Sequence, residues 1–175
     1  MRQLIVAFGL ALAGLLTACA PPPGPVGYRN MQVEMTSLAA VDLNRLAGDW
    51  HEVAGIYDPA QSGCAAGVSR IAPLAPGRVE ITLAECAGVG ARTVVARQER
   101  AAGRFKLDLP GRLGQPWWVL WTDEEGRVLV LGTPSGAFAA ILSRGPQLSR
   151  SRLAAAKQVL ALNGYDPKAL RAPLR

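Results

Sequence analysis

The sequence has little of what most catalytic and metal sites require. It contains one histidine, His51, and three cysteines, Cys19, Cys64 and Cys86. Alternation along the strand expected around Trp50 puts His51 on the outer face, so no Ser-His-Asp or Cys-His arrangement can be built around it. One histidine and two cysteines expected to be oxidised do not make a zinc site. We therefore expect no catalytic residues, no metal and no cofactor.

Clustered positive charge is also missing. The 19 basic and 13 acidic residues give a formal net charge of +6, but the lysines and arginines are scattered singly. Nucleic acid is therefore not an expected partner. Attraction to anionic lipid headgroups remains an alternative to a basic surface without a partner. The Gly88-Val89-Gly90 run lacks the third glycine and the helix of a dinucleotide site, and is interpreted as a hairpin turn.

The N-terminus has the layout of a secretory signal. Arg2 precedes an apolar stretch over residues 4–16, which is too short to span a bilayer as a mature helix. The run Leu16-Thr17-Ala18-Cys19 resembles the bacterial lipobox, so we expect a signal peptide over residues 1–18 and acylation of Cys19. An ordinary signal with a chance cysteine is the alternative. Because Ala20 stands where a retention aspartate would, the expected location is the outer membrane of the cell envelope, facing the periplasm.

A proline-rich stretch over residues 20–25 cannot join a helix or sheet interior and is typical of a tether. We expect residues 19–40 to be this tether and residues 41–175 to form one domain. In an oxidising compartment, Cys64 and Cys86 form an even pair. Folding the chain about the turn at residues 75–77 brings them onto neighbouring strands, which predicts a disulfide; two separate buried thiols are the alternative.

Short β-prone runs fill the chain from Gly48 to Arg144, separated by Gly, Pro and Asp turns without helical periodicity. They predict an all-β fold, an eight-stranded up-and-down antiparallel β-barrel whose closure removes the edge strands. The expected strands are Trp50–Ile56, Ala65–Ile71, Arg78–Glu85, Thr93–Glu99, Phe105–Leu109, Trp117–Asp123, Arg127–Leu131 and Phe138–Arg144.

One amphipathic α-helix is predicted after the barrel, between an N-cap at Ser149 and a stop at Gly164. Both faces of the run from Trp117 to Thr122 are apolar, which indicates a strand buried on both sides. We therefore expect the helix to pack outside the barrel on the last strands.

Three motifs in order resemble those of the lipocalin family, and the lipobox makes the chain similar to bacterial outer-membrane lipoprotein lipocalins. Gly48 and Trp50 match the first motif, Asp123 the second, whose usual tyrosine is replaced by Glu124, and Arg144 the third. An arginine can lay its guanidinium over a tryptophan ring, so Trp50 and Arg144 are expected to plug the barrel floor.

The resemblance implies which residues face the interior. Trp50 sets the inward phase of its strand, which adds Glu52 and Ala54. The family's phase on the other strands adds an almost wholly apolar set of candidate ligand-binding residues: Val79, Ile81, Leu83, Val94, Phe105, Leu107, Trp117, Val119, Trp121, Val128, Val130, Phe138 and Ala140, with Leu142 beside them. Glu52 is the one inward carboxylate, interpreted either as an anchor for a ligand headgroup or as a buried structural group.

The leading hypothesis is a membrane-tethered lipocalin that binds a small apolar ligand, such as a fatty acid or a lysophospholipid, with a role in envelope lipid transport or storage. The alternative is an envelope interaction lipoprotein whose barrel is filled by its own side chains. An isomerase on this fold would need an acid/base pair that the sequence does not offer.

Overall fold

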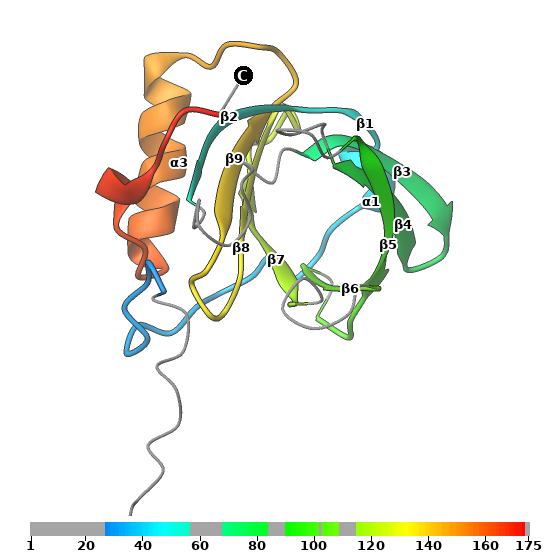
Figure 1. Ribbon diagram of the computed structural model, residues 1–175, viewed down its shortest axis with the longest axis horizontal. Coiled ribbons are helices and arrows are strands. Elements are labelled where there is room, and N and C mark those ends of the chain that lie inside the picture. The colour runs from blue at the N-terminus through cyan, green and yellow to red at the C-terminus, as the bar shows by residue number, and fades with distance from the viewer. Residues whose placement is uncertain (1–26, 57–67, 84–89, 102, 109–114, 174–175) are drawn as a thin grey trace, which may run out of the picture.

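The computed structural model describes residues 27–56, 68–83, 90–101, 103–108 and 115–173. One antiparallel sheet curls into a nearly closed barrel, and a long helix lies outside it (Figure 1). The strands are β1 (Gly48–Asp49), β2 (His51–Ile56), β3 (Val68–Ala75), β4 (Arg78–Leu83), β5 (Arg92–Gln98), β6 (Arg104–Leu107), β7 (Trp117–Thr122), β8 (Val128–Gly132) and β9 (Ala139–Ser143). The helices are α1 (Leu43–Leu46), α3 (Arg150–Leu162) and the 3-10 helix η2 (Pro167–Ala169).

In the part of the chain that the structure describes, the barrel has nine strands, whereas the sequence predicted eight. The difference lies at Trp50, which separates β1 from β2. β1 pairs with β3, whereas β2 pairs with β9. The predicted strand Trp50–Ile56 corresponds to β2, and the added strand β1 precedes it, so consecutive residues contribute to both edges of the sheet and bring them together.

Two ends of the barrel can be distinguished. Pairing of Ile56 with Ala139 puts the β8–β9 hairpin at the end where β2 finishes. We call this the open end. The other end, which we call the closed end, carries α1, Trp50 and the β7–β8 turn, and its walls are bridged by Arg144.

Apolar side chains form two separate clusters, one on each face of the sheet. The inner cluster fills the barrel and includes the inward residues of β4, where Val79, Ile81 and Leu83 are buried and alternate with less buried neighbours, as predicted. The outer cluster joins β2, β7, β8 and β9 to α3 through residues such as Ile141 and Leu160. Burial on both faces explains why these strands are apolar throughout.

The predicted inward phase was wrong for Trp121, Val128 and Val130, which belong to the outer cluster. The cause in β7 is a bulge between Val119 and Trp121, which adds one residue and reverses the faces beyond it. Because Trp121 pairs with Val130, that side of β8 also faces outward.

The inner face of β8 consists instead of Leu129 and Leu131. A similar bulge between Glu52 and Ala54 turns Ala54 outward, which corrects its predicted position as well.

The C-terminal helix is confirmed in place and in packing. The hydroxyl of Ser149 accepts a hydrogen bond from the amide of Arg152 and caps α3. Gly164 follows the helix with a φ of +84°, a conformation that favours glycine. The buried residues of α3, Ala156 and Leu160, lie in the outer cluster against the barrel. Among the described residues, no helix combines the length and apolar character needed to cross a membrane.

The N-terminal segment 27–40 belongs to the folded unit, which differs from the boundary expected near Val41. Met35 is buried, and the amide of Leu38 donates to the carbonyl of Val119 at 2.9 Å. Gly103 packs so closely on Leu38 that a side chain there would collide with its backbone. The segment therefore leads from the β8–β9 hairpin past Met35 in the outer cluster to Leu38, which packs on the inner cluster, and on to α1 (Figure 1).

Candidate ligand-binding site

The floor of the barrel is built around Trp50 and Arg144. The guanidinium carbon of Arg144 lies 3.8 Å from the centre of the Trp50 ring, which confirms the predicted stacking. Its nitrogens donate to the carbonyls of Arg45, Asp49 and Gly126. Burial lowers the pKa of Arg144 and the nearby charge of Asp49 raises it. The site therefore tolerates a cation because three carbonyls and an aromatic face replace its water.

Gly48 makes room for this arrangement. It has a φ of +106°, and a side chain there would place its Cβ 3.0 Å from the guanidinium of Arg144. The indole nitrogen of Trp50 donates to the carbonyl of Leu46 at 2.9 Å, which fixes the ring against α1. The residues matched to the first and third motifs thus act together as a structural plug.

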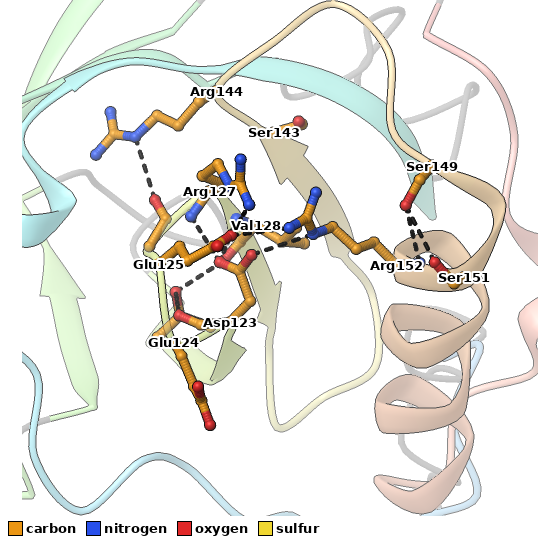
Figure 2. Close-up of polar contacts among 12 residues, drawn as sticks. Asp123, Glu124, Glu125, Arg127, Val128, Ser143, Arg144, Ser149, Ser151 and Arg152 are labelled. Carbon is orange, nitrogen blue, oxygen red and sulfur yellow. Dashed lines mark hydrogen bonds and ion pairs between the residues drawn. The ribbon is translucent and has the colours of Figure 1, made fainter.

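Asp123, matched to the second motif, organises the turn beside this plug. One oxygen of its carboxylate accepts from the amides of Arg127 and Val128, at 2.6 and 2.9 Å. The other lies 3.4 Å from Arg152 of α3. Glu125 also pairs with Arg127 and Arg152, so the turn is tied to the helix (Figure 2). These contacts stabilise the closed end of the barrel.

Above the floor, the barrel encloses a small apolar cavity of about 20 Å³. That volume accommodates about one water molecule. Its walls come from α1 and five strands: Leu46, Val68, Ile71, Val79, Ile81, Phe105, Trp117, Val119, Leu129 and Leu131. No side chain in this lining can donate to a polar ligand except through the indole of Trp117.

A second pocket, which is partly open to solvent, lies beside the first at the closed end. It has a volume of about 260 Å³ and lies between residues 38–46 and β7. Its lining is Leu38, Ala40, Val41, Asp42, Arg45, Leu46, Val119 and Thr122. Leu46 and Val119 line both pockets, so these two side chains lie between the small inner cavity and the larger pocket at the closed end.

An aromatic pair narrows the interior at the open end. The rings of Trp117 and Phe138 are stacked, with centres 4.9 Å apart and planes inclined by 27°. Trp117 begins β7 and Phe138 precedes β9, so both lie where the strands reach the open end. Trp117 is buried and Phe138 is half-buried, which leaves the pair between the inner cluster and the surface.

Glu52 is the one acidic side chain on the inner face of β2, where it pairs with the inner-cluster residue Leu142. Both of its carboxylate oxygens are buried and have no hydrogen-bond partner among the described residues. Burial raises the pKa of Glu52 from 4.5 to about 7. The carboxyl group of Glu52 can therefore bind a proton or a hydrogen-bond donor near neutral pH.

Most of the candidate set does come together inside the barrel. The inner cluster contains Val79, Ile81, Leu83, Val94, Phe105, Leu107, Trp117, Val119, Ala140 and Leu142, and Phe138 packs against it. Sequence reasoning missed Leu46, Val68, Ile71, Leu129 and Leu131. Cys19, Cys64 and Cys86 lie outside the described residues, so the anchor and the disulfide stay predictions.

Comparison with known proteins gives the same architecture. The model of the lipocalin-like domain family matches residues 41–175. The chain belongs to the lipocalin family. Lipocalins typically bind small hydrophobic ligands in such a barrel. A search of curated proteins finds no match.

Two solved structures show the same fold. An odorant-binding protein superposes with a TM-score of 0.57 at 15% identity, covering 76% of this chain and 93% of its own. A bovine lipocalin allergen superposes with a TM-score of 0.59 at 16% identity, covering 75% and 94%. At these identities the likeness concerns the fold alone.

Proposed function

We propose that this lipocalin is a lipid-anchored carrier in the cell envelope, which binds one long apolar chain, such as that of a fatty acid or lysophospholipid, and takes part in lipid transport or storage. The observation that carries the proposal is the lining of the inner cavity. All ten lining residues are apolar, including Ile81, Val119 and Leu131. A ligand that offers only an apolar body is the kind that such walls accommodate.

Space for the ligand would come from movement of Leu46 and Val119, the two side chains that line both pockets. As it stands, the inner cavity of about 20 Å³ is too small for such a chain. Rotation of Val119 and Leu46 would join it to the neighbouring space of about 260 Å³. Each methylene moved from water into the joined space contributes about 0.8 kcal/mol, less the cost of ordering the chain.

The small inner cavity also favours a second candidate function. In that alternative the barrel stays filled by its own side chains, and the protein presents its surface to another envelope component. A filled barrel predicts that apolar molecules do not bind inside and that mutation of Val119 changes stability only.

Titration of tryptophan fluorescence with fatty acids of increasing length tests the proposal. Affinity is expected to rise with chain length until the joined cavity is full. Val119→Ala should increase affinity because it widens the opening between the cavities, whereas Val119→Trp should block it. Circular dichroism of both variants checks that they fold. Affinity that is flat with chain length and indifferent to both substitutions would favour the filled barrel.

A further inference from the structure

The folded part of the N-terminal segment begins at the open end of the barrel. The amide of Tyr28 donates to the carbonyl of Gly136 in the β8–β9 hairpin at 3.0 Å. A side chain on Gly27 would place its Cβ 2.5 Å from the carbonyl oxygen of Ser135, so the two backbones are in contact. Gly27, the first described residue after Cys19, therefore lies beside the open end and away from the plug of Trp50 and Arg144.

We call Gly27 and Tyr28 the exit, and hydrogen bonds of the next two residues, Arg29 and Asn30, fix its position. The buried guanidinium of Arg29 donates to the carbonyls of Val33, Pro134 and Asn163, which join the segment to the hairpin and to the end of α3. Asn30 donates to Gly164 at 2.7 Å and Tyr165 forms an isolated bridge with Arg29. The phenol of Tyr165 donates to the carbonyl of Thr133 at 2.7 Å. With three elements joined, the exit cannot move along the barrel without breaking this network.

Only a short length of chain separates the exit from the expected anchor. From Cys19 to Gly27 there are eight residue steps, which span at most about 29 Å when fully extended. Four of the intervening residues are prolines, at positions 21, 22, 23 and 25, and proline-rich chain is semi-rigid. The open end is thus the part of the barrel that such a tether keeps nearest the bilayer.

The surface next to the exit suits a membrane interface. Three large apolar side chains are strongly exposed in the described part of the molecule: Met31 at 63%, Leu74 at 53% and Leu162 at 69%. Met31 and Leu162 flank the contact between residues 30 and 164 near the open end, whereas Leu74 lies near the β3–β4 turn at the closed end. Two exposed arginines also lie near this end: Arg92 at the start of β5 and Arg171 beside Gly55 of β2. Neither has an ion-pair partner among the described residues, so both can bind anionic headgroups.

We propose that the lipoprotein sits with the open end of its barrel against the bilayer that holds the acyl chains of Cys19, with Met31 and Leu162 at the headgroup level and the Trp50–Arg144 plug directed away from it. This orientation rests on the anchor in the proposed function. In this orientation the stacked pair of Trp117 and Phe138 lies at the end of the barrel that faces the bilayer. The occupant of this surface is a lipid bilayer.

Site-specific quenching tests the orientation on the full acylated protein. A fluorescent amino acid replaces Met31, Leu162, Leu74 or Glu124, one at a time, and each protein is placed in vesicles of phosphatidylethanolamine and phosphatidylglycerol with a nitroxide on some headgroups. All four positions are exposed, so the labels should not disturb the core. Quenching is expected to be several-fold stronger at 31 and 162 than at the closed-end controls 74 and 124.

A lengthened tether gives a second measurement. Inserting about twelve Gly and Ser residues between Pro25 and Val26 relaxes the restraint, and quenching at 31 should fall toward that at 74. Equal quenching at all four positions, or stronger quenching at 74 and 124, overturns the orientation even if fatty acids still bind. Quenching confined to 31 and 162 in a protein that binds no fatty acid supports the orientation and instead contradicts the carrier function.

Discussion

Arg144 lies over the ring of Trp50 with its guanidinium carbon 3.8 Å from the ring centre, and it joins the last strand to the first. The same distance separates Arg104 from the ring of Trp118 on the outer surface. The two pairs differ in their surroundings. The guanidinium of Arg144 donates to three backbone carbonyls, whereas the one side-chain hydrogen bond described for Arg104 goes to the hydroxyl of Ser37.

The contributions of Trp50 and Arg144, the pair at the barrel floor, to the free energy of unfolding should therefore be coupled. A double-mutant cycle with Trp50→Phe and Arg144→Met, followed by urea unfolding, is expected to give a coupling energy of about 1 kcal/mol or more. The matched cycle with Trp118→Phe and Arg104→Met should give a smaller value, because that guanidinium is more weakly held. Additive effects at the floor would show that the stacking does not contribute to stability.

Glu52 should make the protein less stable as the pH rises. Its folded pKa of about 7 lies above the ordinary value of 4.5, so the folded state holds the proton more tightly than the unfolded chain does. The unfolding free energy should fall between these two pH values, by up to roughly 3 kcal/mol, and level off above pH 7.

Glu52→Gln removes this titration. Its unfolding free energy should be close to that of the parent below pH 4.5 and higher above pH 7. Urea unfolding of both proteins across this range measures the difference. Parallel curves for the two proteins would mean that the carboxyl is solvated or paired in solution.

Cys64 and Cys86 are predicted to form a disulfide in protein isolated from the envelope. Closing the loop between them should stabilise the fold by about 3 kcal/mol in the chain-entropy model. Intact mass after unfolding with an alkylating agent and without reductant is the measurement. Alkylation at both positions would rule the bridge out, and alkylation only after reduction would establish it.

Cys19 is predicted to be the membrane anchor. Cys19→Ala should move the protein from the membrane fraction to the soluble fraction, because the acyl chains are lost. Washing membranes at high salt separates this contribution from that of exposed cations such as Arg92. Retention of Cys19→Ala protein in the washed membranes would contradict the lipid anchor.

The sequence was sufficient to predict which residues face inward where one face of a strand or helix is polar. On β4, Glu80 and Thr82 alternate with Val79 and Ile81, so the inward face follows directly. The caps of α3 and the floor pair also follow from local signals, at Ser149, Gly164 and the first and third motifs.

The sequence was insufficient to predict which residues face inward on strands whose two faces are both apolar. Val128, Leu129, Val130 and Leu131 are all buried, so their pattern carries no information about phase. The bulge at Leu120 leaves no trace in composition. Docking of residues 27–40 depends on tertiary contacts, such as those of Arg29, that hydrophobic periodicity does not report.

The faces of β8 alternate between the inner and the outer cluster, so this strand can report directly whether an apolar chain lies inside the barrel. A fatty acid with a photoreactive diazirine near the end of its chain is cross-linked to the protein, and the modified residues are identified by mass spectrometry. A chain inside the barrel should modify Leu129 and Leu131 on the inner face and Val119, and unlabelled fatty acid should compete with this modification. Cross-links at Val128 and Val130, or at exposed Met31 and Leu162 alone, would contradict binding inside the barrel.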